Sequence, residues 1–238
     1  MNTFKNKAVY WGFIVLASMF AMVLGIRAAH NGTATNILYM YIIALPDIIL
    51  LMLIIPIISL IILYEIDGFM ATNRLLAFNS RLKWWVTLRI KLLKDCFACA
   101  AIIILPIFLL SNIFIGTIKT FGEWIYILFL FLTYFMYFFL LALCIVTIEI
   151  KFNQSLLAVS FVLFISFLPN ILSSLFRHLK IPIRIPSINS LLNLSYTFDE
   201  DNFCWLRCIG MCIVLFVLLF LAEKAGKMLF KKQDIYWK

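Results

Sequence analysis

The residues whose spacing first suggests chemistry are three cysteines near the end of the chain. Cys204, Cys208 and Cys212 repeat every four residues, so they share one face of a helix. Such a face would suit a thiol metal site or a redox site. No histidine lies within the apolar segments around them, and cysteine is commonly a small buried hydrophobe. The sequence therefore favours a packing role for these thiols.

Sites for catalysis, metals and phosphate are not evident elsewhere in the chain. Asp199, Glu200 and Asp201 form an acidic cluster, which is more typical of a solvated turn than of a metal site, and His30 and His178 fall in predicted loops. There is no H-E-x-x-H, no G-x-S-x-G and no G-x-x-x-x-G-K-[ST] phosphate loop. A glycine-rich pore loop is also missing. We expect no enzyme activity, metal or cofactor in this chain, which leaves transport or scaffolding ahead of catalysis.

A single carboxylate, Asp47, falls inside an apolar run. A charge near the middle of a bilayer costs about 2.5–3.5 kcal/mol, so such residues usually face a protein interior or a water-filled cavity. One interpretation is that Asp47 lines a translocation path. The other is that the apolar run is longer than the bilayer, which would leave Asp47 near the headgroups. The sequence does not decide between them.

The composition sets the class of protein. Of the 238 residues, 65% are apolar and only 13% are charged, with a mean hydropathy of +1.08. Because the surface of a soluble domain needs more polar cover than this, the chain is an integral membrane protein. We predict an all-α fold with one transmembrane domain (residues 1–238). Its six spans cover about 9–26, 37–64, 96–115, 124–147, 155–175 and 204–222.

Charge predicts the orientation of these spans. The formal net charge is +9, but Lys and Arg stand at span ends, which is typical of topology determinants and lipid contacts and argues against nucleic-acid binding. With both termini cytoplasmic, most of the 20 Lys and Arg fall inside. The outer side then holds only Arg27, Lys119, Arg177, Lys180, Arg184 and Arg207. We therefore expect a multi-pass protein with both termini in the cytoplasm.

A charged segment over residues 65–95 separates the second and third predicted spans. Its start, Glu65-Ile66-Asp67-Gly68, suits the first turn of a helix because acidic residues stabilise a helix N-terminus. This short helix would carry an exposed apolar knob, formed at helical spacing by Ile66, Phe69, Met70 and Asn73, with Arg74 alongside. Ser80 would cap a second helix. The knob would either dock in a partner's groove or lie in the headgroup layer, and the residues alone favour neither.

The layout resembles the permease subunit of an ABC-2-type exporter. The similarity lies in six spans, a charged helical loop between the second and third, and a long outer segment (176–203) with short helices between the fifth and sixth. The loop itself is similar in its acid and glycine and in the basic stretch that follows, namely Glu65, Gly68, Ser80-Arg81, Trp84-Trp85 and Lys91. The family usually has a longer amphipathic helix before the first span, whereas about eight residues precede it here.

The resemblance implies partners and a mechanism. Residues 65–74 would be a coupling helix that docks on a separate ABC ATPase subunit, which binds ATP and Mg, and the outer helices would close the exit. Permeases of this kind pair with a second copy or a sibling in the bacterial plasma membrane. A compact, Phe- and Ile-rich chain looks most like those exporting amphipathic peptides, such as phenol-soluble modulin or bacteriocin export and immunity systems. Asp47, Tyr134 and Phe138 are the candidate path residues.

We therefore expect a membrane subunit of an ATP-driven exporter that moves amphipathic peptides or other hydrophobic cargo. Aromatic side chains of the second and fourth spans would offer such cargo an apolar surface of low specificity. One alternative is a non-transporting membrane anchor or immunity protein that binds a toxic peptide. A membrane-embedded enzyme is a further alternative, for which the sequence shows no catalytic group.

Overall fold

The fold is known from a computed structural model. It describes residues 3–33, 36–70, 81–114, 121–180, 186–195, 198–199 and 202–232. The long helices are α1 (Thr3–His30), α4 (Ile55–Met70), α6 (Arg81–Phe114), α7 (Phe121–Phe152), α8 (Ser155–His178) and α10 (Trp205–Lys232). The shorter elements are α2 (Ile37–Ala44), α3 (Asp47–Ile49), the π-helical η1 (Leu50–Ile54), α9 (Ile188–Leu192), β1 (Phe198–Asp199) and β2 (Asn202–Phe203).

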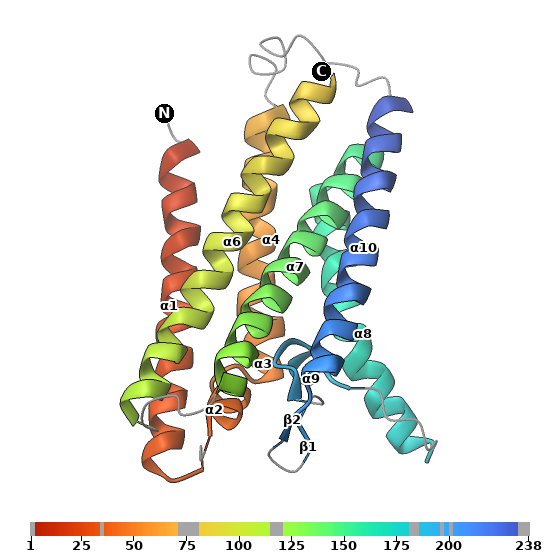
Figure 1. The fold of residues 1–238 in the computed structure, drawn as a ribbon. Helices are drawn as coiled ribbons and strands as arrows, with labels where there is room; N and C mark the ends of the chain where they lie inside the picture. The colour runs from red at the N-terminus through yellow and green to blue at the C-terminus, as the bar shows by residue number, and fades with distance from the viewer. Residues whose placement is uncertain are drawn as a thin grey trace.

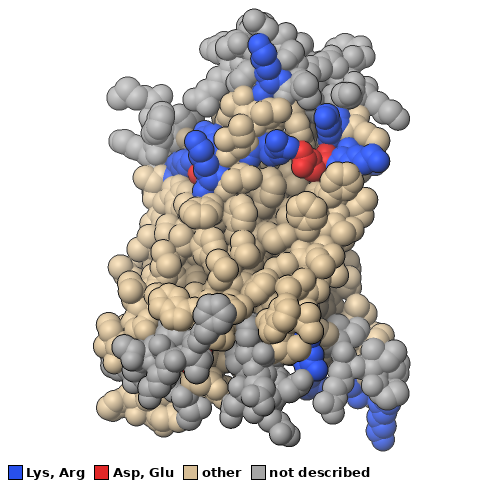
Figure 2. All heavy atoms as spheres, viewed as in Figure 1, with Lys and Arg blue, Asp and Glu red and all other residues tan. Residues whose placement is uncertain are grey.

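Six helical segments of the described chain are long and apolar enough to cross a membrane. They are Lys7–His30, Asp47–Phe69, Lys83–Ile113, Gly122–Phe152, Ser155–His178 and Trp205–Leu229. They run side by side (Figure 1), and on the face in Figure 2 the described charged residues gather at the two ends, with an uncharged belt between them. The prediction of a helical, multi-pass membrane protein with six spans is confirmed.

The two ends of the bundle differ. We call the end where α1 begins, α4 ends, α6 begins and α10 ends the basic end. The opposite end, where α9 and the short β1–β2 hairpin lie, is the hairpin end (Figure 1). In the hairpin, Phe198 pairs with Phe203 and Asp199 with Asn202. This strand pair was not predicted from the sequence.

The second span begins later than predicted because Pro46 interrupts it. The residue before a proline avoids the helical region, and Leu45 has φ −120° and ψ 60°. Helix α2 therefore ends at Ala44, and a separate segment (α3, η1 and α4) starts at Asp47. At 1.5 Å per residue, the residues from 47 to 69 reach about 35 Å, enough to cross the hydrocarbon core.

The predicted segment 65–95 is helical in its two described parts, 65–70 and 81–95. Helix α4 continues to Met70, and α6 already begins at Arg81, which agrees with the predicted helix start after Ser80. The basic residues of the stretch 81–95 therefore lie on α6. Their charge makes them unsuited to the lipid core, so the span was predicted to begin after them. Charge does not prevent helix formation, however, because Lys, Arg and Leu have high helix propensity and Trp is also tolerated. Residues 71–80, with Asn73, Arg74 and Ser80, lie outside the described residues.

Helix α7 occupies the middle of the bundle and packs against α4, α6, α8 and α10. Its inward side chains Tyr126, Tyr134 and Phe138 are fully buried, whereas Trp124 is exposed. Helices α8 and α10 lie at the periphery and expose many apolar side chains. The six cysteines are free thiols, and the described residues contain no group of three or more His, Cys, Asp or Glu that could hold a metal ion.

Candidate functional site

At the basic end, a buried carboxylate joins three helices. Glu65 of α4 is 1% exposed and forms ion pairs with Lys7 of α1 and Lys91 of α6. Lys7 also reaches both carboxylate oxygens of Asp95, each at 3.3 Å. We call these four residues the ion cluster. Its two cations and two anions balance, as a buried group of charges requires.

The helical spacing explains why the cluster forms. Lys91 and Asp95 are four residues apart on α6, so their side chains share the face that α6 turns toward α1 and α4. Glu65 lies in the last turns of α4, and Lys7 lies in the second turn of α1. Each of the three helices thus contributes at least one charge at the same depth. The cluster fixes how α1, α4 and α6 lie relative to one another at this end.

An aromatic pair closes the junction between α4 and α6. The Trp84 indole N–H donates to the Phe69 carbonyl at 3.1 Å, which satisfies one of the open carbonyls at the end of α4. The two rings meet edge-on with centroids 6.2 Å apart. The Lys91 ammonium lies 5.1 Å from the centre of the Phe69 ring, within cation–π range. Phe69 therefore serves the chain's own packing.

This arrangement corrects the predicted exposed knob. Phe69 is 6% exposed and Ile66 is fully buried, because both pack into the bundle. Asp67 is exposed and Gly68 half-buried. The Met70 side chain, Asn73 and Arg74 lie outside the described residues. In the sequence Phe69 is an apolar residue within a polar stretch, which suggested that it is exposed. The structure shows that it packs against Trp84, which lies 15 residues further along the chain.

Helix α10 joins the basic end through α6. Arg89 of α6 forms an ion pair with Glu223 of α10. Near this pair along α10, Gly226 lies against the buried ring of Trp85, and a Cβ atom at Gly226 would stand 2.6 Å from Trp85 Cη2. Only a residue without a side chain allows this approach. Helices α1, α4, α6 and α10 are thus tied together at the basic end.

At the hairpin end, the short helix α9 is held by side chains from other helices. The Asn189 backbone N–H donates to Asp47 Oδ1 at 2.7 Å, and the Ile188 N–H donates to Asn170 Oδ1 of α8 at 2.8 Å. The first N–H groups of a helix have no partner within it, so these contacts satisfy α9 from outside. Asp47 begins the crossing segment, so the structure places it at the end of its span.

Two asparagines of this segment, Asn189 and Asn193, bind the surrounding helices. Asn189 Nδ2 donates to the Leu45 carbonyl at 2.6 Å, a carbonyl left open where Pro46 ends α2. Asn193 Oδ1 accepts from the Tyr134 hydroxyl at 2.8 Å, and the Asn193 backbone carbonyl accepts from the Tyr126 hydroxyl at 2.9 Å. The two side chains also bond each other, since Asn193 Nδ2 donates to Asn189 Oδ1 at 3.2 Å.

The structure brings two of the three candidate path residues to α9. Asp47 and Tyr134 both bond it directly, and Phe138 packs edge-on against Tyr134 with ring centroids 5.7 Å apart. Sequence reasoning missed Asn189 and Asn193. Their signal was present, since two asparagines four residues apart in I-N-S-L-L-N-L share one face of a helix. Comparison with family models, with curated proteins and with solved structures finds no match for this chain.

Proposed function

We propose that this chain is the membrane-spanning subunit of an ATP-driven exporter of the ABC-2 type. It moves amphipathic peptides or other hydrophobic cargo and is paired with a second permease. A separate ATPase subunit binds ATP and Mg. In this proposal the basic end faces the cytoplasm, which agrees with the excess of Lys and Arg expected on that side.

One observation carries the proposal. The segment from Asp47 to Met70 is continuous, and it bonds α9 through Asp47 at the hairpin end and carries the ion cluster through Glu65 at the basic end. A continuous helical segment can carry a displacement from one end to the other, either as a whole or by bending at a defined point. Force applied near the end of α4 would therefore reach the contact that holds α9. An exporter driven from the cytoplasm needs such a mechanical connection.

The π-helical turn η1 supports this mechanism. It occupies Leu50–Ile54, directly between Asp47 and α4, and Pro56 follows it. Turns of π-helix are rare and frequently stand at functional sites, and a proline removes a backbone donor. We propose that the segment bends here when the ATPase binds ATP. The Asp47–Asn189 bond would then break, and α9 would leave its place between α2, α7 and α8.

Export is tested in inverted membrane vesicles from cells that carry the chain, compared with vesicles from cells that lack it. A fluorescent amphipathic helical peptide should accumulate inside only with the chain and with hydrolysable ATP. Peptide that binds equally with and without ATP would contradict export and favour the membrane immunity or anchor protein. Peptide that is cleaved or modified would favour the enzyme.

Docking is tested separately by a photo-crosslinking amino acid at Asp67, which is exposed at the end of α4. We expect a crosslink to a nucleotide-binding subunit that weakens or strengthens when ATP is added. A crosslinker at exposed Lys180, at the hairpin end, is the matched control and should not capture that subunit. Phe69→Ala does not isolate docking, because it also removes the ring contact with Trp84.

A further inference from the structure

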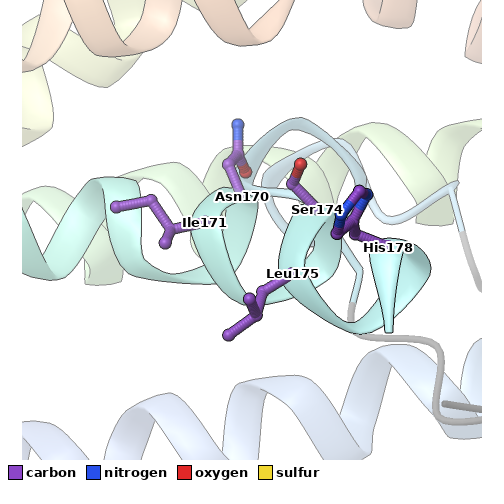
Figure 3. A pocket seen from close by; sticks show the side chains of 5 residues that line it. All are labelled: Asn170, Ile171, Ser174, Leu175 and His178. Atoms are coloured by element: carbon purple, nitrogen blue, oxygen red, sulfur yellow. The ribbon is translucent and has the colours of Figure 1, made fainter. Parts of the chain in front are cut away.

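A hollow of about 570 Å³ lies along α8 toward the hairpin end (Figure 3). Its described lining comes from one helix, in two adjoining stripes. Asn170, Ser174 and His178 recur every four residues and project from the upper edge of α8 in Figure 3, while Ile171 and Leu175 form the apolar stripe beside them. The volume is within the range of small-molecule sites.

Polar groups along this stripe remain open for a ligand. The Asn170 carbonyl oxygen is engaged by the Ile188 N–H, which leaves the amide N–H groups of the same side chain available. Ser174 and His178 are exposed, and their side chains form no hydrogen bond or ion pair with the described residues. The hollow is therefore a polar and apolar surface with free donors.

Positive charge gathers at the tip of the same helix. Arg177 lies in the last turn of α8, and Lys180 follows the helix, where its φ of 53° turns the chain. Both side chains are exposed, and neither is paired with an acidic side chain in the part of the chain that the structure describes. An anion is the complement of this tip.

The order of these features along the membrane normal identifies the ligand. The span of α8 ends at His178, so Arg177 and Lys180 stand at headgroup level. Ile171 lies about 10 Å deeper along the helix, at 1.5 Å per residue, in the acyl region. The site thus has positive charge at the helix tip and, below it, a polar stripe and an apolar stripe side by side. A phospholipid matches this arrangement, with its anionic head at the tip, an ester oxygen at the nearest donor and an acyl chain along the apolar stripe.

We propose that the hollow on α8 binds an anionic phospholipid of the leaflet at the hairpin end. Its phosphate contacts Arg177 and Lys180, an ester oxygen accepts from Ser174, and an acyl chain lies over Leu175 and Ile171, beside Asn170. Because Asn170 also holds the Ile188 N–H, the bound lipid touches a residue that anchors α9. This site does not depend on the cargo or on the proposed export.

Photo-crosslinking in proteoliposomes tests the site. The full chain is reconstituted with phosphatidylglycerol or phosphatidylcholine that carries a photoactivatable group on an acyl chain, and adducts on residues 170–178 are quantified by peptide mass spectrometry. We expect adducts with phosphatidylglycerol to exceed those with phosphatidylcholine. Each basic residue near an anionic membrane is worth about a fivefold change in binding, so Arg177→Ala with Lys180→Ala should lower the adduct yield by an order of magnitude or more.

Matched variants keep the test specific. Lys224→Ala with Lys227→Ala removes two exposed charges at the basic end and should leave these adducts unchanged. Leu175→Trp fills the hollow without changing charge and should lower the adduct yield with both lipids. Equal labelling by the two lipids, or equal yields in the two double variants, would overturn the proposal. Loss of adducts on addition of an amphipathic peptide, with no effect of charge removal, would instead assign the hollow to peptide.

Discussion

The two ends of the bundle are held together by different chemistry. The basic end relies on full charges, with Glu65 inserted between Lys7 and Lys91. The hairpin end relies mainly on neutral hydrogen bonds to Asn189 and Asn193. Removing one partner from a buried ion pair costs about 3–5 kcal/mol, whereas a single hydrogen bond between membrane helices contributes about 0.6 kcal/mol on average.

This difference indicates which end opens more easily. An ion cluster fails as a unit, because each charge needs its partner. A set of neutral bonds can be broken one at a time, at a small cost each. The basic end is thus suited to receive force without coming apart, and the hairpin end is suited to release α9. The variants below test that division, from the largest expected effect to the smallest.

Glu65→Ala should have the largest effect on stability. It leaves Lys7 with Asp95 alone and removes the buried partner of Lys91, whose partly exposed side chain can turn to water, so we expect a loss at the lower end of the range for buried ion pairs, about 3 kcal/mol, and a clear fall in thermal unfolding temperature in detergent. Glu65→Gln with Lys91→Gln removes one charge of each sign and is the matched control. Equal stability of Glu65→Ala and this double variant would show that charge balance does not stabilise the basic end.

Asp47→Ala should act on α9 more than on the whole fold. It removes a hydrogen bond from a charged acceptor to the Asn189 N–H, worth about 1.5–3 kcal/mol. We expect faster labelling of a cysteine introduced at Ser190 by a water-soluble maleimide. Asp47→Asn retains an acceptor oxygen and should give an intermediate rate. Unchanged labelling in both variants would show that Asp47 does not anchor α9.

Gly226→Ala should loosen α10 from the basic end. The new methyl group would meet the buried Trp85 ring, and overpacking of this kind costs about 1–3 kcal/mol. Thermal unfolding measures the loss. Gly210→Ala, on the same helix with open space around it, should be neutral. Equal behaviour of the two alanines would argue against the close contact between α6 and α10.

Tyr134→Phe should have the smallest effect. It removes only the hydroxyl that donates to Asn193 and keeps the ring against Phe138, so we expect a loss of about 0.6–1 kcal/mol. The exposed Tyr39 provides the control, since Tyr39→Phe should change nothing measurable. A loss as large as that of Glu65→Ala would remove the distinction between the two ends.

The sequence predicted the spans well because each is a long apolar run, and burial in lipid needs no knowledge of neighbours. It was less accurate about helix ends, because the predicted start after Ser80 agrees with α6 but α4 continues beyond the predicted end at residue 64 to Met70. Residues 81–95 are too charged for the lipid core yet continue α6, since charge determines depth in the membrane and leaves helical structure intact. Proline was informative at one position only: Pro46 interrupts the second predicted span, whereas Pro106 and Pro169 lie inside continuous helices.

The candidate site was harder to predict because its contacts are distant in sequence. Glu65 pairs with Lys7, and Asp47 bonds Asn189 across 142 residues. Phe69 looked exposed because its partner Trp84 lies beyond the connection between α4 and α6. Such pairings follow from helix packing, and a single sequence does not contain that information.

The position of Lys7 has a consequence for how the protein is made. The span of Lys7 is synthesised before the two spans that carry its acidic partners, Glu65 and Asp95. Until then its ammonium group has neither partner and must remain at the lipid headgroups. The ion pairs that hold this end of α1 are therefore complete only after the span that carries Asp95 has been inserted.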